Sequence, residues 1–326
     1  MLNQDSKIFI TGHRGLVGSA IHRALKRQGF RNLLTASHTE LDLTNQAAVE
    51  LFMDVHRPDA IFAAAGRVGG IWANAQEPAQ FIYENTLIAS NLIHSAHKNR
   101  VQKLLYLGSS CIYPKRAEQP IREEALLTGS LEATNQWYAI AKIAGIKMCQ
   151  AYRQQYGCDF IAAMPTNLYG PGDHYDPDRS HVLPALLQKF SEAKQLQLPE
   201  VECWGSGRPR REFLYVDDLA DACLKLMECY SSEEIVNIGY GSDVSIHELT
   251  TMVQEVVGYK GQIRWDRSKP DGTYRKLLDS RKMRELGWEP KIGLREGMAR
   301  AFADYQERYP SVDAAVPATQ ISTSLA

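Results

Sequence analysis

The sequence lacks long apolar runs, a large net charge and a framework of cysteines. No apolar stretch reaches the roughly 18 residues that cross a membrane, and MLNQDSK runs directly into the apolar IFI without the regions of a secretory signal. We therefore expect a cytoplasmic protein that does not act at a membrane. The formal net charge of −1 gives no general attraction to nucleic acid, so an anionic ligand must be met by local cations.

The six cysteines form no C-x-x-C pair and no cysteine and histidine spacing typical of zinc sites. We therefore expect no bound metal. The composition, with 44% hydrophobic and 23% charged residues, excludes a disordered or collagen-like chain. The stretch at 311–326 is small, polar and without periodicity, and we expect it to form a flexible tail.

Short aliphatic or β-branched runs alternate with longer stretches of helical periodicity in the first half of the chain. The runs lie at 7–11, 32–36, 59–64, 103–108 and 159–164. Their lack of polar alternation is typical of strands that are covered on both faces. The pattern therefore predicts an α/β fold with a Rossmann-type, doubly wound parallel sheet.

The second half of the chain mixes loop-rich segments with further predicted elements. Two segments, NLYGPGDHYDPDRSH and WGSGRPRREF, are rich in glycine and charge and suit a substrate-binding region. Helices are predicted at 182–193, 217–230, 245–257 (with a serine cap) and 294–305, and strands at 235–238 and 262–265.

The order of these elements predicts two domains, the smaller one discontinuous. The helix at 217–230 and the strand at 235–238 are expected to return the chain to the sheet. We therefore expect a dinucleotide-binding Rossmann domain from 1–165 and 214–240. A smaller α/β substrate-binding domain would comprise 166–213 and 241–310.

A glycine-rich turn follows the first predicted strand and precedes a predicted helix. It has the form G-x-x-G-x-x-G, which lets the backbone turn tightly, approach a pyrophosphate and begin a helix whose N-terminus faces the phosphate charge. A purely structural turn is the alternative interpretation. The residues expected to bind the dinucleotide are Gly12, His13, Arg14, Gly15, Leu16, Val17 and Gly18.

The preferred dinucleotide is expected to be NADP(H). The second predicted strand ends in TASH, without the acidic residue that holds the ribose hydroxyls of NAD. Arg14 can pair with a 2′-phosphate, because a guanidinium fork matches phosphate oxygens, and His38 lies where it can contribute. The alternative is that both are solvated loop residues.

A serine, a tyrosine and a lysine predict hydride-transfer chemistry at a carbonyl group. Ser109 follows the strand at 103–108, and Tyr138 and Lys142 are four residues apart on a predicted helix, so they share one face. A nearby ammonium stabilises a phenolate, so we expect Lys142 to lower the pKa of Tyr138 while Ser109 holds the carbonyl oxygen. A surface tyrosine and lysine pair is the alternative.

With these motifs the chain resembles the extended short-chain dehydrogenase/reductase family over roughly 7–309. Within that family it is similar to the branch that acts on GDP-4-keto-6-deoxy-D-mannose. The segments that carry this resemblance are GHRGLVGSAI, VGGIWAN, GSSCIYPK, YAIAKIAGIKMC, MPTNLYGPGD, SHVLPALL, WGSGRPRREFLYVDD and KPDGTYRKLLD.

The resemblance implies epimerisation at C3 and C5 of the sugar and then NADPH-dependent reduction at C4, which yields GDP-L-fucose. It assigns Cys111 and His181 as base and acid of the epimerisation. A thiol with a pKa near 8.5 and an imidazole with a pKa near 6.5 suit reversible proton transfer. The alternatives are that Cys111 only packs and that His181 caps the helix after it.

The remaining contacts are implied by the same resemblance. The cofactor is expected to meet Leu107, Gly108, Ser109, Ser110, Lys142, Pro165, Thr166, Asn167, Leu168 and His181. The GDP-sugar is expected to meet Lys189, Trp204, Arg211 and Asp271, although Lys189 and Asp271 could be solvated charges. A homodimer paired through helices such as the one at 138–156 is also implied.

Two departures from the family pattern and two other functions remain open. Many relatives carry a basic residue in place of His38, and Gly66-Arg67 replaces a common Ala-Lys. A sister enzyme, such as the GDP-sugar reductase of the colitose pathway, would use the same triad. A cofactor-sensing regulator would retain the fold without catalysis, but the intact triad argues against it.

Overall fold

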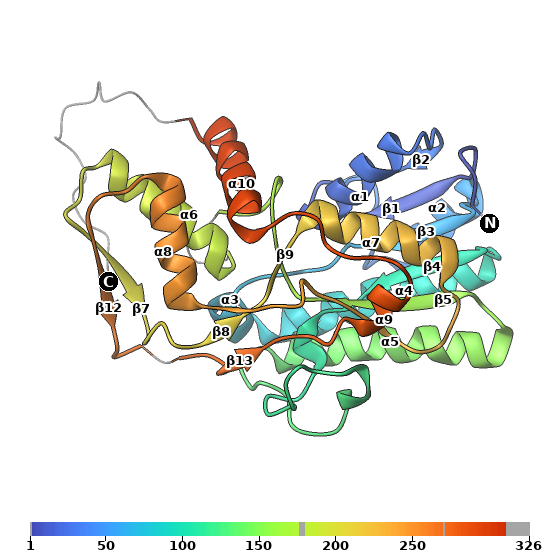
Figure 1. Ribbon diagram of the computed structural model, residues 1–326. Coiled ribbons are helices and arrows are strands. Elements are labelled where there is room, and N and C mark those ends of the chain that lie inside the picture. Colours follow the sequence, from blue (N-terminus) through green and yellow to red (C-terminus); the bar gives the residue numbers. More distant parts are fainter. Residues whose placement is uncertain (1, 176–179, 270, 311–326) are drawn as a thin grey trace.

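The fold is described by a computed structural model that covers residues 2–175, 180–269 and 271–310. The tail predicted at 311–326 lies outside these residues. A six-stranded parallel sheet has the order β10-β5-β4-β3-β1-β2 (Figure 1). Its strands are β1 (Ile8–Thr11), β2 (Leu33–Leu34), β3 (Ala60–Ala63), β4 (Lys103–Leu107), β5 (Phe160–Pro165) and β10 (Val236–Ile238).

The predicted Rossmann-type sheet is therefore confirmed, with one strand shorter than expected. All residues of β1, β3, β4 and β5 are buried, as strands covered on both faces should be. At the edge of the sheet, β2 has two half-buried residues instead of the five predicted, because its polar neighbours gain nothing from burial. The strand order changes direction between β1 and β3, which places a crevice at the carboxyl ends of these strands.

Helices cover both faces of the sheet. On one face lie α1 (Leu16–Arg27) and α7 (Val216–Cys229), which share an apolar core with β1 and β5. The other face is covered by α2 (Gln46–His56), α4 (Pro78–Lys98) and α5 (Gln136–Tyr156). Ile21 and Leu25 of α1 follow helical spacing and are fully buried, and burial of each stabilises the fold by about 1.5–3 kcal/mol.

A third apolar cluster lies on the left in Figure 1, away from α2 and β4 on the right. It contains α6 (Val182–Gln195), α8 (Ile246–Val257) and α10 (Leu294–Arg308), together with the paired strands β7 (Glu200–Trp204) and β12 (Gln262–Asp266). The serine cap predicted for α8 is confirmed: Ser245 Oγ accepts from Glu248 N at 3.1 Å, and the Glu248 carboxylate accepts from Ser245 N at 2.7 Å.

Short elements lie in the connections between the larger ones. They are α3 (Ile71–Gln76), η1 (Ser110–Ile112), η2 (Glu123–Ala125), β6 (Asn167–Tyr169), β8 (Arg210–Arg211), β9 (Phe213–Tyr215), β11 (Val244–Ser245), β13 (Arg275–Lys276) and α9 (Arg281–Glu285). The domain limits inferred from the sequence stay a prediction, and the one at 213/214 falls inside β9. Within the described residues, no helix is both long and apolar enough to cross a lipid bilayer.

Glu212 forms hydrogen bonds to three segments, which follow β5, β10 and β13. The residue is fully buried between β8 and β9. Its two oxygens accept backbone N–H bonds from Gly241 at 2.7 Å and from Leu278 at 3.1 Å. Its backbone carbonyl accepts a bond from Asn167 Nδ2 at 2.8 Å. Glu212 thus links the ends of β5, β10 and β13.

Replacing this carboxylate is expected to destabilise the fold. Glu212→Ala leaves two buried N–H groups without an acceptor, and each such loss costs about 1–3 kcal/mol. We expect urea unfolding to show a free energy of unfolding lower by about 2 kcal/mol or more. Glu228→Ala, which removes an exposed carboxylate from α7, is the control and should change it by less than about 0.5 kcal/mol. Equal effects of the two variants would contradict this role of Glu212.

Candidate active site

The glycine-rich turn lies between β1 and α1 at the crevice of the sheet. Gly12 has a φ of 67°, which L side chains rarely adopt. A Cβ on Gly18 would lie 2.2 Å from the Gly12 carbonyl oxygen, so only glycine fits there. Gly15 is the N-cap of α1 and makes no side-chain capping bond, and the first turn carries no acidic residue.

These features leave a site that fits a dinucleotide pyrophosphate. Within the part of the chain that the structure describes, no side chain caps the backbone N–H groups at the start of α1, and the partial positive charge of the helix N-terminus favours an anion. His13 Nδ1 is buried without a hydrogen-bond partner among the described residues, which suits a contact with a ligand. The sequence prediction of a phosphate-binding turn therefore has a matching geometry.

The surroundings of the expected 2′-phosphate contain an acid that sequence reasoning missed. Arg14 and His38 are both exposed, and His38 Nε2 lies 3.9 Å from the Asp42 carboxylate. The Glu40 carboxylate accepts bonds from Ser37 N at 2.7 Å and Ser37 Oγ at 2.6 Å. These bonds, aided by Arg14, lower the pKa of Glu40. Ser37 thus engages one of the two carboxylate oxygens, Oε2. Arg14 is the nearby cation whose guanidinium best matches a phosphate group.

Close packing of α5 on β4 brings the predicted triad together. A Cβ on Gly145 would lie 2.4 Å from the Tyr106 ring, so glycine lets the helix approach the strand. One turn earlier, Lys142 is buried, lies 5.0 Å from the centre of that ring and donates to Leu107 O at 2.9 Å. Ser109 follows Leu107 and Gly108 directly, at the carboxyl end of β4.

The Tyr138 ring packs against Phe81, which in turn packs against Arg67. The Phe81 ring meets Tyr138 edge-on, with 6.3 Å between ring centres. The Arg67 guanidinium lies 5.6 Å from the centre of the Phe81 ring. It also forms ion pairs with Glu77 and with Glu84, the latter at 3.0 Å. Arg67, which the sequence left without explanation, therefore fixes the segment after β3 onto α4, because its fork can reach two carboxylates at once.

The sequence predicted that Lys142 lowers the pKa of Tyr138, but in the structure this pKa is raised. Burial raises the pKa of Tyr138 well above its usual value, and Cys111 and Tyr106 raise it further. Lys142 lies 5.7 Å from the centre of the Tyr138 ring, with its ammonium bonded to the Leu107 carbonyl. Burial also lowers the pKa of Lys142 to about 8, which weakens its charge near neutral pH.

Cys111 lies beside this triad, in η1. Its backbone N–H donates to Ser109 Oγ at 3.4 Å, and its side chain is 7% exposed. Burial raises the pKa of the thiol, while Lys276, Ser109 and Lys142 act in the opposite direction. Cys111 is therefore a buried thiol next to Ser109, and two lysines favour its ionised form.

His181 is the N-cap residue of α6, but its side chain makes no capping bond. The residue is exposed to solvent. Partial desolvation by the neighbouring protein lowers the pKa of the imidazole, and the positive charge of Lys276 lowers it further. A low pKa makes the protonated ring a stronger acid. The same lysine thus acts on both His181 and Cys111.

The predicted GDP-sugar residues lie on α6, β7, β8 and the segment after β12. Arg211 is half-buried and donates to Thr273 O at 2.5 Å, while Asp271 accepts from Ser206 Oγ at 2.6 Å. Trp204 is 64% exposed, and Lys189 is exposed on α6. A cavity of about 460 Å³ is lined by Ser206, Arg208, Arg267, Ser268, Lys269 and Asp271.

The segment predicted to line the nicotinamide pocket follows the carboxyl end of β5. Thr166 N donates to Ile238 O at 3.0 Å, and Asn167 is held by its bond to the Glu212 carbonyl. Pro165 is the last residue of β5 and Leu168 lies in β6. Among the residues for which the structure gives positions, no three His, Cys, Asp or Glu side chains group as metal ligands would.

Comparisons with known proteins identify the family of the chain. A family model described as the NAD dependent epimerase/dehydratase family matches residues 8–239. The chain belongs to this family. GDP-L-fucose synthase 1 of Arabidopsis thaliana is 59% identical over 305 residues, which is 94% of each chain. GDP-L-colitose synthase of Yersinia pseudotuberculosis is 39% identical over 296 residues, or 90% of this chain and 96% of that relative.

A solved member of the family shares the whole fold. The GDP-mannoheptose C4 reductase of Campylobacter jejuni, determined with NADP bound, superposes with a TM-score of 0.87 and 38% identity. The match covers 94% of this chain and 100% of that one.

The sequence did not single out Lys276, although its charge acts on both Cys111 and His181. It follows Arg275 in a two-residue strand with no periodic pattern, so only its place in KPDGTYRKLLD could have drawn attention to it. Burial lowers the pKa of Lys276, while the nearby Cys111 raises it.

Removing this charge is expected to change the titration of His181. In Lys276→Met the pKa of His181 should rise, because a positive charge that disfavours the imidazolium is lost. Lys276→Arg keeps the charge and should leave the pKa close to that of the unmodified chain. NMR titration of the histidine ring signals measures both. An unchanged pKa in Lys276→Met would mean that the two groups do not interact.

Proposed function

We propose that the chain converts GDP-4-keto-6-deoxy-D-mannose to GDP-L-fucose, by epimerisation at C3 and C5 and then reduction at C4. The observation that carries the proposal is that Cys111 lies beside Ser109, with its backbone N–H bonded to Ser109 Oγ, and that the charge of Lys276 acts on both Cys111 and His181. A simple carbonyl reductase needs the triad alone. A thiol and an imidazole in addition to the triad suit proton transfer at carbon.

The epimerisation uses the acidity that the C4 ketone gives to the hydrogens on C3 and C5. The Cys111 thiolate removes one proton and leaves an enolate, and protonated His181 returns a proton to the opposite face, which inverts that carbon. The thiol then loses its proton to solvent and the imidazole gains one from it, which restores both groups, and a second cycle inverts the other carbon. Lys276 favours the thiolate and makes the imidazolium a stronger acid, so its charge assists both proton transfers.

The reduction uses the triad at the carboxyl end of β4. Ser109 donates a hydrogen bond to the C4 oxygen, and the Tyr138 hydroxyl gives its proton to that oxygen as the alcohol forms. A raised pKa keeps Tyr138 protonated until that moment. When bound, NADPH supplies the hydride to C4.

The cofactor would be held by the turn between β1 and α1. The backbone of Gly12 to Gly18 faces the pyrophosphate, and Arg14 with His38 meets the 2′-phosphate of NADP(H). Lys142 and the segment 165–168 are proposed to contact the ribose and nicotinamide. A related reductase that is 38% identical was solved with NADP bound, which supports this choice of cofactor.

The GDP portion would be held by the region around β7, β8 and the segment after β12. Lys189 and Arg211 are cations that suit the diphosphate, and the exposed Trp204 ring can pack on a flat ligand face. Asp271 can accept hydrogens from hydroxyl groups or guanine. The relatives named above act on GDP-sugars according to their names, which supports the substrate class.

A homodimer and a cytoplasmic location complete the proposal. Tyr83 of α4 and Trp137, Ile140 and Tyr156 of α5 are large apolar side chains that remain exposed, on two helices that pack together. A second copy of the chain would cover them. All six cysteines are free thiols, which suits a reducing compartment.

The activity is tested by incubating the purified chain in deuterium oxide with GDP-4-keto-6-deoxy-D-mannose and either NADPH or NADH. We expect faster oxidation of NADPH, and by NMR a GDP-L-fucose product that carries deuterium at C3 and C5. Oxidation with a product labelled at one position or neither would indicate a sister enzyme of the colitose-pathway type. No oxidation with either cofactor would contradict the proposed substrate.

A further inference from the structure

Four positive charges meet on two very short parallel strands. In the register of β8 and β13, Arg210 lies opposite Arg275 and Arg211 lies opposite Lys276. Like charges directly opposite each other on neighbouring strands repel. These strands have only two residues each, so few backbone bonds oppose that repulsion.

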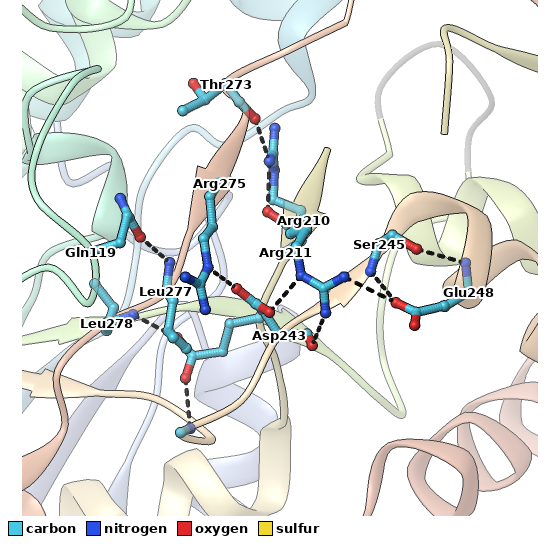
Figure 2. A network of polar contacts seen from close by, with 12 residues as sticks. Gln119, Arg210, Arg211, Asp243, Ser245, Glu248, Thr273, Arg275, Leu277 and Leu278 are labelled. Atoms are coloured by element: carbon cyan, nitrogen blue, oxygen red, sulfur yellow. Dashed lines mark hydrogen bonds and ion pairs between the residues drawn. The ribbon is translucent and has the colours of Figure 1, made fainter. Parts of the chain in front are cut away.

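An acidic residue from the segment before β11 lies between the two arginines on one face. Asp243 accepts from Arg210 Nε at 2.8 Å and forms an ion pair with Arg275, and Arg210 Nη2 donates to the Asp243 carbonyl at 2.9 Å. The Asp243 side chain is only 5% exposed. Figure 2 shows the carboxylate between the two guanidinium groups, with Glu248 on the far side of Arg210.

The other two cations project to the opposite face. Neighbouring residues in a strand point to opposite sides, and Figure 2 shows Arg210 and Arg211 extending in different directions from β8, Arg211 toward Thr273. Lys276, the neighbour of Arg275, interacts with Cys111, Arg211 and Glu132 and acts on His181. One face of the strand pair is therefore neutralised by Asp243, and the two cations on the other face include Lys276, whose charge acts on Cys111 and His181.

We propose that Asp243 is a positioning residue, which holds β8 and β13 together so that Lys276 and Arg211 reach the proton-transfer site. The assignment of that site rests on the proposed function, but the placement of Lys276 can be measured without substrate. Without the carboxylate, Arg210 and Arg275 repel, the strands separate and Lys276 moves away from His181.

The test is NMR titration of His181 in a double-mutant cycle. In Asp243→Asn, which preserves shape and removes charge, the pKa of His181 should rise, but no more than in Lys276→Met. In the Lys276→Met background, the same Asp243→Asn change should leave the pKa unchanged, because the charge that it positions is already absent. Equal shifts in both backgrounds would overturn the proposal, since they would show an effect that does not pass through Lys276.

A matched variant separates positioning from loss of stability. Glu248→Gln removes the other carboxylate that contacts Arg210 and weakens the capping box of α8, but it leaves the Arg210, Asp243 and Arg275 contacts intact. It should lower the free energy of unfolding without changing the pKa of His181. A shift in Glu248→Gln as large as that in Asp243→Asn would show that the titration follows general stability, against the proposal.

Activity measurements then distinguish a failure of the role proposed for Asp243 from a failure of the proposed function. If the chain uses GDP-4-keto-6-deoxy-D-mannose, Asp243→Asn should slow the exchange of C3 and C5 hydrogens about tenfold or more and raise the KM for the GDP-sugar, with the affinity for NADPH unchanged. An unaltered exchange rate in that case would contradict the role of Asp243. If the unmodified chain does not use this substrate, the proposed function fails, while the titration cycle still decides where Lys276 is held.

Discussion

The buried carboxylate of Glu212 is the constraint on which the arrangement of the site depends. A charge removed from water is tolerated only when its oxygens are hydrogen-bonded, and here the donors are backbone groups of Gly241 and Leu278. These donors come from segments that are far apart in the sequence. The bonds therefore fix where the chain leaves β10 and where it continues after β13. Since Arg211 precedes Glu212 and Lys276 lies two residues before Leu278, Glu212 fixes the backbone beside both cations, while Asp243 neutralises the two arginines on the same short strands.

Burial and one lysine set the acid and base properties of the site. Burial favours the neutral forms of Cys111 and His181, which raises the pKa of the thiol and lowers that of the imidazole. The charge of Lys276 opposes the first effect and adds to the second. The result is a thiol at the end of β4 that is helped to ionise, and an imidazolium on α6 that readily releases its proton. Tyr138, in contrast, has no such assistance, so it stays protonated and suits the donation of a proton in the reduction.

Local motifs made the fold and part of the site predictable from the sequence. The glycine turn after β1 and the spacing of Tyr138 and Lys142 depend on residues close together in the chain, and their geometry matched the expectation. Lys276 and Asp243 were missed because their contacts lie between strands of two residues that carry no periodic pattern. Arg67 had no explanation until its partners on α4 were in place. The pKa of Tyr138 was predicted in the wrong direction because the sequence gives the neighbouring lysine but not the depth of burial.

The central claim is that one site performs proton transfer at carbon and reduction with different residues. It is tested most directly by comparing Cys111→Ser and Tyr138→Phe in deuterium oxide, with exchange at C3 and C5 and oxidation of NADPH followed separately. The account predicts that Tyr138→Phe retains exchange and loses oxidation. Cys111→Ser should slow exchange more than it slows reduction of a substrate already epimerised. Equal loss of both activities in each variant would contradict the division of roles.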